Sequence, residues 1–446
     1  MNIVERIFHN ADRQAVALIC GGREIGYGEL IEMTGLAAVP LATTPAARVA
    51  LDCPNGIAHV VLALAIVRAG KCLVPLASEL SPRERERVIR ETGVGAIVDA
   101  AGEVRPVPVG ELAFDEAALA ALNPAFIRFS SGTTGTSKGI VLSHESLLAR
   151  VTAANRGLGI GPADRIVWIL PMAHHFAVSI MLYLLHGATT IVENSHLAED
   201  VLTAATTHRG TVLYGAPFHH ALLAAEGSGR AWPSLRLAVS TAATLPLATA
   251  QAFDQRFGLP LAQGLGIIEV GLPLLNLARA REKPASVGQP LPDYAAEVRG
   301  DDGELFLRGP GMLDAYLHPW RGRAEILEDG WFRTGDLARI DSEGDLHLLG
   351  RSHSVINVAG LKCFPEEIEA VLNEVPEVQR ARVLGKPNAR FGAVPVAEIV
   401  PRDPAQPPKI SALAAHCRGA LARYKIPVEF RLVESVPLTP SGKIQR

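Results

Sequence analysis

Short apolar runs alternate with helix-like stretches over the first 350 residues of this 446-residue chain, and this alternation restricts its possible folds more than any other feature. Brief runs rich in Val, Ile and Leu are typical of strands buried on both faces. Such strands, separated by helices, predict an α/β architecture in several layers with largely parallel sheets. We expect strands at Ile166–Leu170, Thr190–Val192, Thr211–Leu213 and Leu235–Ser240, and helices at Ala177–Leu185 and Leu245–Phe257.

The pattern changes after Gly350 and indicates a second, smaller domain. Pro365 opens a predicted helix, because proline is favoured at the first helical position. We therefore expect a large N-terminal domain over residues 1–350 and a small, mobile α+β C-terminal domain over residues 351–446. Its other predicted elements are strands at Ser354–Val358, Ala381–Leu384, Val394–Val400 and Phe430–Val433, and a helix at Ser411–Tyr424.

Composition argues against several classes of protein. The formal net charge of −3 gives no reason to expect nucleic acid or an anionic membrane as a partner. Five cysteines without a C-x-x-C pair favour a reducing cytosol over a disulfide framework or structural zinc. Charged residues occupy the N-terminal stretch where a signal peptide is apolar, and the longest apolar run, Val60–Val67, is too short to span a bilayer. The sequence predicts a cytoplasmic protein without a membrane span.

A hydroxyl- and glycine-rich segment, SSGTTGTSKG, runs from Ser130 to Gly139 between two apolar runs. Backbone N–H groups and hydroxyls in such a loop can surround a polyphosphate, and glycines permit turns that a Cβ would block. Lys138 adds a positive charge. The P-loop pattern G-x-x-x-x-G-K-[ST] is not matched, because Ser137 replaces its second glycine and Gly139 its last residue. The segment predicts a phosphate loop of another type, with a flexible surface loop as the alternative.

Four further segments narrow the chemistry. Residues 263–269, QGLGIIE, form a predicted glycine-rich turn that ends in Glu269, and a carboxylate near a triphosphate is a usual ligand of Mg²⁺. Residues 333–337, RTGDL, place Asp336 in a predicted turn, where a carboxylate can accept both hydrogen bonds of a ribose diol. Arg351 lies at the expected domain boundary, and Lys443 lies in a PSGK turn near the end of the sequence.

In this order, the segments resemble the adenylate-forming superfamily, which includes acyl-CoA synthetases, aryl-CoA ligases, nonribosomal adenylation domains and luciferases. The resemblance extends over essentially the whole chain. It implies a reaction in two halves, in which a carboxylate and ATP give acyl-AMP and pyrophosphate and a thiol then takes the acyl group. Such a reaction brings two anions together, so catalysis requires charge neutralisation and positioning.

The resemblance also implies roles for individual residues. Lys443 would bridge the substrate carboxylate and the α-phosphate, Lys138 would hold the β- and γ-phosphates, and Glu269 would bind Mg²⁺. Asp336 would bind the ribose hydroxyls with help from Arg351. The other ATP-binding residues implied are Ser130, Ser131, Gly132, Thr133, Thr134 and Gly135 of the phosphate loop, Ala242, Ala243 and Thr244 of the adenine pocket, and Gly264, Leu265, Gly266 and Ile268.

Several positions depart from the family pattern. An aromatic residue that stacks on adenine is common at the place of Leu265, and a threonine at the place of Ile268. Loss of stacking and of one hydrogen bond would weaken ATP binding by about 1–3 kcal/mol unless the pocket compensates. The hinge between the domains, usually Asp or Lys, is His353, which favours a neutral polar hinge, with a pH-sensitive domain rotation as the alternative. Asn357 replaces a common lysine.

The acyl pocket is expected around residues 171–176, PMAHHF, which resemble acyl- and aryl-CoA ligases. No acidic residue is present there to hold an ammonium group, so an α-amino acid is disfavoured. The segment Tyr214–Phe218, which lines the acyl pocket in relatives, has a composition (Tyr, Ala, Pro, Phe) that favours an apolar acid and leaves aryl and alkyl substrates open. The adjacent histidines lack H-E-x-x-H spacing and do not indicate a metal site. The expected pocket residues are His174, His175, Tyr214, Gly215 and Phe218.

The acceptor is expected to be coenzyme A or the phosphopantetheine of a carrier protein, with Gly360 lining the thiol tunnel. No attachment site for such an arm follows Lys443, and few residues precede the phosphate loop, so a ligase that loads a partner carrier protein stays open. A nucleotide-binding scaffold or regulatory protein of the same fold is the alternative from another class. Leu265, Ile268 and His353 favour that alternative, whereas the retained lysines and carboxylates argue against it.

Overall fold

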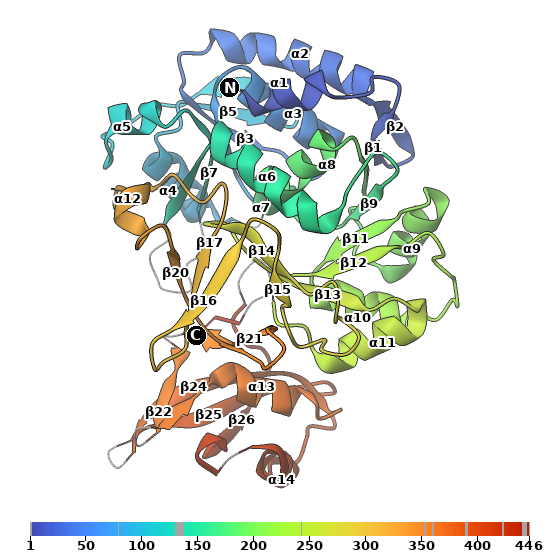
Figure 1. The fold of residues 1–446 in the computed structure, drawn as a ribbon, viewed down its shortest axis with the longest axis vertical. Coiled ribbons are helices and arrows are strands. Elements are labelled where there is room, and N and C mark those ends of the chain that lie inside the picture. The colour runs from blue at the N-terminus through green and yellow to red at the C-terminus, as the bar shows by residue number, and fades with distance from the viewer. Residues whose placement is uncertain are drawn as a thin grey trace.

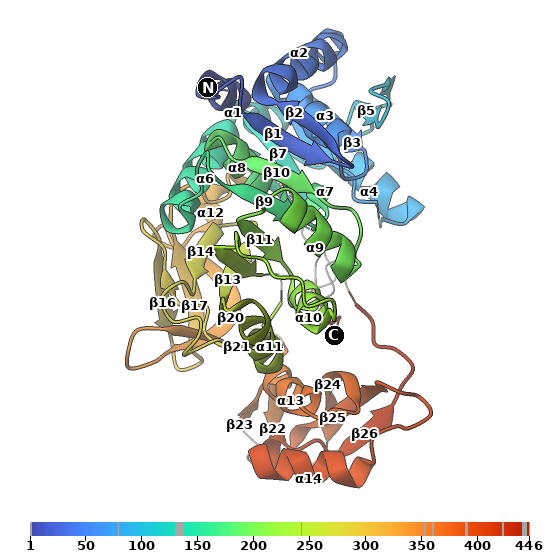
Figure 2. The same ribbon diagram turned by 90° about the vertical axis from the view of Figure 1, so that its right-hand side faces the viewer.

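The computed structural model describes residues 2–78, 80–129, 138–241, 243–351, 354–358, 361–388, 391–421, 423–438 and 444–445. Elements up to residue 351 form a layered body, and those from residue 354 onward form a smaller C-terminal unit below it in Figures 1 and 2. The two parts meet where the last strand of the body lies against the first helix of the C-terminal unit.

A nine-stranded sheet forms the first strand layer of the body, and its six central strands are parallel. Its central strands are short and apolar because both faces are covered. In spatial order the strands are β15 (Gln289–Pro290), β14 (Gly271–Leu275), β13 (Leu261–Ile267), β12 (Leu237–Ser240), β11 (Val212–Gly215), β9 (Arg165–Trp168), β10 (Thr189–Val192), β1 (Val16–Cys20) and β2 (Arg23–Gly26).

An eight-stranded sheet forms the second strand layer. Its core strands β4, β3 and β5 are parallel, whereas β7 and β8 form an antiparallel hairpin whose connection holds the glycine-rich loop. In spatial order the strands are β19 (Arg321–Gly322), β18 (Ala315–Tyr316), β8 (Gly139–Ser143), β7 (Pro124–Phe129), β4 (Cys72–Pro75), β3 (Arg48–Asp52), β5 (Ala96–Asp99) and β6 (Val104–Pro106).

Helices pack on the faces of these sheets. α9, α10 and α11 share a core with one face of the nine-stranded sheet, and α4 and α5 share a core with one face of the eight-stranded sheet. The remaining helices contribute to the largest core, to which both sheets also contribute. The helices are α1 (Ile3–His9), α2 (Tyr27–Thr43), α3 (Ile57–Arg68), α4 (Pro82–Thr92), α5 (Glu116–Ala121), α6 (His144–Leu158), α7 (Met172–His175), α8 (Met181–Leu185), α9 (Ala198–Thr207), α10 (Pro217–Ala225), α11 (Leu247–Phe257) and α12 (Arg323–Ile326).

The longest apolar run of the sequence belongs to α3, in which every residue from His59 to Val67 is buried. A helix that is apolar on all sides is buried within a large core or a membrane, and here the core accounts for it. Among the described residues, no helix is both long and apolar enough to cross a bilayer.

A four-stranded antiparallel sheet completes the body and leads into the C-terminal unit. Its strands in spatial order are β16 (Ala295–Arg299), β17 (Glu304–Arg308), β20 (Phe332–Ile340) and β21 (Leu346–Arg351). β20 and β21 form a hairpin, and the carboxyl end of β21 lies beside α13. Gly350 has φ +148°, a backbone conformation that favours glycine, and a Cβ there would also meet the Glu366 carboxylate.

The C-terminal unit has its own sheet and its own core, whose buried members among the described residues run from Ile356 to Cys417. Helices α13 and α14 contribute Ile368, Leu372, Leu413 and Cys417 to that core. Its elements are β22 (Ile356–Val358), β23 (Leu361–Cys363), α13 (Pro365–Asn373), β24 (Val378–Asn388), β25 (Gly392–Pro401), α14 (Ile410–Ala420), a 3₁₀ turn (Arg423–Lys425) and β26 (Glu429–Leu432).

The predicted α/β class, with largely parallel sheets and a small C-terminal part, is confirmed. Two helix predictions need correction. The helix expected at Ala177–Leu185 is a π-helix over Phe176–Ile180 followed by α8. The helix expected at Ser411–Tyr424 ends at Ala420, because Leu421 adopts an extended backbone with φ −121° and ψ 150°.

Candidate active site

The expected phosphate loop connects β7 and β8. Phe129 pairs with Gly139, so the two ends of the loop lie side by side. Residues 130–137 lie outside the described residues, and the predictions for Ser130, Ser131, Gly132, Thr133, Thr134 and Gly135 therefore stay predictions. Lys138 is described, and it lies at the point where the chain enters β8.

Glu269 lies in a tight turn between β13 and β14. The turn is closed by the Val270 N–H, which donates to the carbonyl of Ile267 at 3.1 Å. Gln263 to Ile267 belong to β13, which corrects the glycine-rich turn expected from the sequence. A Cβ on Gly264 would lie 3.1 Å from Leu275 Cδ1, so glycine allows the antiparallel β14 to approach closely.

A buried arginine supports this turn from behind. Arg150 on α6 is 1% exposed, and its guanidinium donates to the carbonyl of Ile268 at 2.8 Å and to the carbonyl of Gly311 at 2.8 Å from Nε. Burial lowers the pKa of Arg150 to about 10, so the side chain is still charged at neutral pH. Ile268 thus contributes to the site through its backbone carbonyl rather than through the hydroxyl of the usual threonine.

Tyr316 on β18 connects Lys138 with Glu269. The Lys138 Nζ lies 4.6 Å from the centre of the Tyr316 ring, and the Tyr316 hydroxyl donates to Glu269 Oε1 at 3.3 Å. Burial, and then the Glu269 charge, raise the pKa of Tyr316, so the hydroxyl remains a donor. The structure therefore brings together two site residues that are far apart in the sequence.

A second network holds the strands around these three residues. Asp314 accepts hydrogen bonds from the Ser143 N–H at 2.6 Å and from the Ser146 hydroxyl at 3.0 Å, and Arg323 lies 2.6 Å from the same carboxylate. Ser143 is the N-cap of α6, which follows β8. This network fixes the strand that leaves the phosphate loop to the segment that carries Tyr316.

The segment expected to line the adenine pocket follows β12. The Leu245 N–H donates to the Gln263 side chain at 2.6 Å, and the Thr241 N–H donates to the carbonyl of Gly215 at 3.0 Å. These bonds place Ala243 and Thr244, both exposed, at the carboxyl edge of the sheet beside the end of β13. Leu265 is partly buried in β13, Gly266 is exposed there, and Ala242 lies outside the described residues.

Asp336 lies within β20, and not in a turn as the sequence suggested. Gly335 beside it has φ +70°, and the register shifts between Leu337 and Ala338, so the strand is locally distorted. Asp336 is opposite Arg351 on β21, and Arg351 Nε lies 2.6 Å from Asp336 Oδ1. The structure therefore brings together the two residues expected to bind ribose.

Aromatic side chains gather where the acyl pocket is expected. The rings of Tyr214 and Trp168 stack with centres 5.9 Å apart, and the His175 ring lies edge-on to Trp168 at 5.6 Å. Gly215 follows Tyr214 at the end of β11 and is buried. The carbonyl of His174 accepts a hydrogen bond from Arg128, the residue before Phe129 on β7.

Phe218 differs from the other predicted pocket residues because 57% of it is exposed. It lies on α10, next to His219 and His220. Burial lowers the pKa of His219 and of His220 to about 4, so both imidazoles are neutral at physiological pH. His220 Nε2 lies 3.1 Å from the carbonyl of Val239, which fixes α10 to β12.

Three predicted residues of the domain junction, namely His353, Gly360 and Lys443, lie outside the described residues. Residues on either side of Lys443 are described. Leu438 and Ile444 form an antiparallel bridge, and the Arg382 guanidinium donates to the carbonyl of Gln445 at 3.0 Å. Of the described residues that flank Lys443, Gln445 is thus bonded to β24 of the C-terminal unit.

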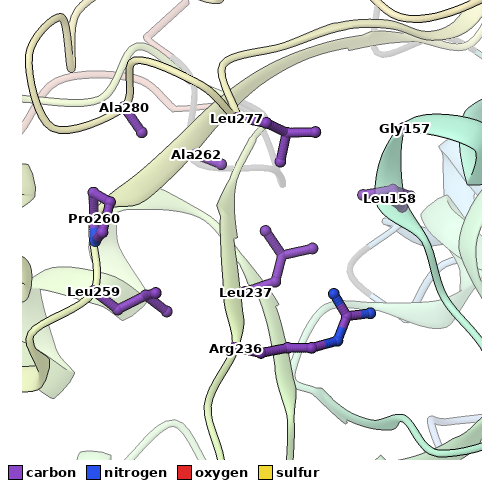
Figure 3. A pocket seen from close by; sticks show the side chains of 9 residues that line it. All are labelled: Gly157, Leu158, Arg236, Leu237, Leu259, Pro260, Ala262, Leu277 and Ala280. Carbon is purple, nitrogen blue, oxygen red and sulfur yellow. The ribbon is translucent and has the colours of Figure 1, made fainter.

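A pocket of about 240 Å³ lies away from these residues (Figure 3). It is found at the amino ends of β12 and β13, whereas the candidate site lies at their carboxyl ends. Its one charged side chain, Arg236, is paired with Asp164 at 2.7 Å. The lining residues are Gly157, Leu158, Arg236, Leu237, Leu259, Pro260, Ala262, Leu277 and Ala280.

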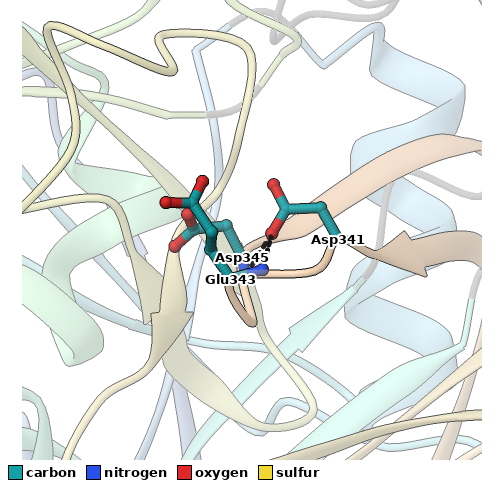
Figure 4. A group of neighbouring side chains, drawn as sticks. All are labelled: Asp341, Glu343 and Asp345. Atoms are coloured by element: carbon teal, nitrogen blue, oxygen red, sulfur yellow. Dashed lines mark hydrogen bonds between the residues drawn. The ribbon is translucent and has the colours of Figure 1, made fainter.

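An acidic cluster occupies the turn between β20 and β21 (Figure 4). Asp341, Glu343 and Asp345 lie close enough to hold a cation, but Lys283 already fills that role. Its Nζ lies 2.7 Å from Asp341 Oδ2 and 2.9 Å from Asp345 Oδ2, and it also pairs with Glu343. The cluster is a structural ion-pair network, and not the Mg²⁺ site expected at Glu269.

Sequence reasoning did not identify Tyr316, Arg150 or Trp168. No local motif marks them, because each contacts a residue more than 40 positions away, namely Lys138, Ile268 and Tyr214 respectively. In the sequence, Arg150 is one of many arginines, and Tyr316 is a single tyrosine without a recognisable motif around it. Only the pairing of β18 with β8 shows that Tyr316 belongs to the site.

Comparison with known proteins now identifies the family. The AMP-binding enzyme family matches residues 6–317, and the AMP-binding enzyme C-terminal domain matches residues 367–443. The chain therefore belongs to the AMP-binding enzyme family, and the expected adenylate-forming superfamily is confirmed.

Curated relatives extend the match. A sulfoacetate–CoA ligase of Cupriavidus necator is 34% identical over 337 residues, which are 72% of this chain and 66% of that protein. A feruloyl-CoA synthase of an Amycolatopsis species is 30% identical over 96% of this chain and 94% of its own length. A 2-succinylbenzoate–CoA ligase of Listeria monocytogenes is 33% identical over 72% of this chain and 68% of its own length.

Solved structures agree with the fold. ATP-bound MatB from Rhodopseudomonas palustris has a TM-score of 0.87 and 25% identity, and the match covers 100% of this chain and 97% of that one. The amide bond synthetase McbA from Marinactinospora thermotolerans has a TM-score of 0.85 and 26% identity over 99% and 97% of the two chains.

Proposed function

We propose that this protein is an acid–thiol ligase that activates a carboxylic acid with ATP and transfers the acyl group to coenzyme A. The observation that carries the proposal is the assembly of Lys138, Tyr316 and Glu269 in an AMP-binding enzyme fold. A cation for phosphates lies over the face of the Tyr316 ring, and a carboxylate for Mg²⁺ lies at its hydroxyl. The relatives named as CoA ligases support the same class of reaction.

In the first half-reaction, a carboxylate oxygen of the acid attacks the α-phosphorus of ATP, and pyrophosphate leaves. Lys138 holds the leaving phosphates, and Asp336 with Arg351 binds the ribose, so the nucleotide is oriented before attack. Lys443, near the end of the sequence, neutralises the charge that develops between carboxylate and phosphate. In the second half-reaction, a thiol attacks the acyl carbon and AMP leaves.

The carboxylate of Glu269 is suited to bind a Mg²⁺ ion. The turn that carries Glu269 is already closed by the hydrogen bond from the Val270 N–H to the carbonyl of Ile267. The Glu269 carboxylate is partly exposed, and it forms no ion pair with a lysine or arginine among the described residues. Mg²⁺ prefers oxygen ligands and needs few from the protein, so one carboxylate beside the ATP phosphates is sufficient. Bound Mg²⁺ would neutralise phosphate charge and stabilise the leaving pyrophosphate.

The domain boundary and the thiol acceptor belong to the same proposal. We place the domain boundary between residues 350 and 351. Among the described residues, the core of the C-terminal unit contains none from the body. His353 is the hinge, and Gly360 lines the thiol tunnel in the second conformation. The stacked Tyr214 and Trp168, with His174, His175 and Phe218, favour an apolar acid. Coenzyme A is the acceptor, with a carrier-protein phosphopantetheine as the alternative, and cytoplasm is the proposed location.

Acid-dependent ATP–pyrophosphate exchange across fatty, aryl and amino acids tests the first half-reaction. We expect exchange with one class of apolar acid and its loss in Lys443→Ala. Exchange that survives Lys443→Ala would show that the role given to Lys443 is wrong. Silence with every acid, while ATP still binds, would instead favour a nucleotide-binding scaffold without turnover.

A second assay separates the acceptors. The acid that supports exchange is incubated with ATP and, in turn, coenzyme A, a phosphopantetheinylated carrier protein or a primary amine. The proposal expects a thioester with coenzyme A. A product with the amine alone would place the protein nearer to the amide bond synthetase that it resembles in fold.

A further inference from the structure

Tyr316 stands between the two oppositely charged residues of the candidate site. Its ring faces Lys138 Nζ at 4.6 Å from the ring centre, and its hydroxyl contacts Glu269 Oε1 at 3.3 Å. The residue is only 5% exposed, so its position is set by the packing around it.

Backbone hydrogen bonds tie the segment around Tyr316 to both partners. The Leu317 N–H donates to the carbonyl of Gly139, the residue after Lys138, at 2.7 Å. The Leu313 N–H donates to the carbonyl of Glu269, also at 2.7 Å. Tyr316 itself pairs with Ile140 in the β18–β8 ladder. The tyrosine is therefore held in register with the cation on one side and the carboxylate on the other.

This geometry keeps the two charges from neutralising each other. An ammonium and a carboxylate that can approach each other directly form an ion pair. In the part of the chain that the structure describes, Lys138 forms no ion pair, and its ammonium rests on the aromatic face instead. A cation–π contact leaves the full charge of the lysine in place, and a hydrogen bond from a neutral hydroxyl leaves the full charge of the carboxylate.

We propose that Tyr316 is a positioning residue that keeps Lys138 and Glu269 apart, so that the ammonium remains available to ATP phosphates and the carboxylate to Mg²⁺. The inference rests on the proposed function of this site. It predicts that a smaller, non-aromatic side chain allows Lys138 and Glu269 to pair, which withdraws both groups from the nucleotide.

The test compares Tyr316→Leu with Tyr316→Phe, which keeps the ring and removes only the hydroxyl. ATP binding is measured by calorimetry in EDTA, so that it depends neither on Mg²⁺ nor on turnover. We expect Tyr316→Leu to weaken ATP binding about 5-fold or more, and Tyr316→Phe to change it less than about 2-fold. Thermal unfolding confirms that each variant is folded, and Tyr27→Phe is the matched control for loss of a buried tyrosine hydroxyl bonded elsewhere.

A double variant distinguishes charge pairing from a local packing defect. In a Glu269→Gln background, Lys138 has no carboxylate to pair with. The further change Tyr316→Leu should then weaken ATP binding less than about 2-fold. Equal weakening in both backgrounds, or none in Tyr316→Leu alone, would overturn the inference.

Mg²⁺ dependence provides the second readout. With an acid that supports exchange, Tyr316→Phe should raise the Mg²⁺ concentration for half-maximal activity several-fold while leaving the ATP KM almost unchanged. An unchanged Mg²⁺ requirement would contradict the role of the hydroxyl. Failure of the wild-type protein to exchange would refute the proposed function alone, because ATP binding in EDTA still tests Tyr316.

Discussion

The guanidinium of Arg351 and the carboxylate of Asp336 lie opposite each other on neighbouring strands, with Nε 2.6 Å from Oδ1. Asp336 is 7% exposed, and the hydroxyl of Thr334 accepts a hydrogen bond from its backbone N–H at 3.0 Å. The carboxylate is thus fixed in place before a nucleotide binds. If Asp336 binds the ribose hydroxyls as proposed, this preorientation reduces the entropy that is lost when they dock.

Replacing Asp336 with asparagine should therefore raise the KM for ATP. Hydrogen bonds to a charged group contribute about 1.5–3 kcal/mol, which corresponds to an increase of roughly 10- to 150-fold. Steady-state kinetics with the activating acid in excess measures the change. Asp301→Asn, an exposed acid in the turn before β17, is the control and should leave KM unaltered. If Asp336→Asn keeps the wild-type KM, the ribose assignment fails.

Arg150→Met should destabilise the fold and impair the Glu269 turn. The carbonyls of Ile268 and Gly311 would lose a buried donor, and unsatisfied buried carbonyls cost about 1–3 kcal/mol each. We expect the free energy of unfolding to fall by about 2–5 kcal/mol in urea denaturation. Arg156→Met, on the same helix with a side chain 59% exposed, should change it by less than about 1 kcal/mol. A stable Arg150→Met variant would show that water or repacking satisfies these carbonyls.

Because His220 is buried in its neutral form, the folded protein should be less stable in mild acid than at neutral pH. Burial lowers the pKa of His220 from its usual value of 6.5 to about 4 in the folded state, so the unfolded chain binds a proton in mild acid that the folded chain does not. Stability is therefore complete above about pH 6.5 and is lost progressively as the pH falls toward 4. His220→Gln should reduce this loss by about 3 kcal/mol.

Denaturation curves at pH 7, 5.5 and about 4.5 measure the effect of His220. The exposed His9 supplies the matched control, because His9→Gln should retain the pH dependence of the wild-type protein. An identical pH dependence in His220→Gln would mean that other groups control the acid sensitivity.

Lys283→Met should lower the melting temperature by leaving the carboxylates of Asp341, Glu343 and Asp345 without their shared cation. Repulsion between like charges is screened by salt, so the deficit should shrink between about 0.05 and 1 M NaCl. Thermal unfolding at both salt concentrations checks this. Lys386→Met, which removes a half-exposed ion pair with Glu429, should have a much smaller effect. A deficit that does not change with salt would indicate lost packing instead.

The sequence by itself determined the fold class, the alternation of strands and helices, and the family. Buried parallel strands need continuous apolar runs, and a run such as Thr189–Val192 is visible without any structure. The family was recognisable because its motifs occur in a fixed order along the chain. The sequence did not reveal that Gly264 and Asp336 lie within strands, since glycine and aspartate ordinarily indicate turns.

Tertiary structure alone decided which side chains meet. The pairing of β18 with β8 brings Tyr316 to Lys138, and hydrogen bonds bring it to Glu269, across more than 40 residues of sequence in each case, and no local pattern records such contacts. Arg150 also depends on tertiary structure, because its buried guanidinium donates to the carbonyls of Ile268 and Gly311, which are distant in the sequence. Local propensity and periodicity report which structure each segment prefers, whereas the candidate site depends on how the segments pack. The charged residues Lys138 and Glu269 could therefore be predicted from the sequence, but the Tyr316 ring that contacts both could not.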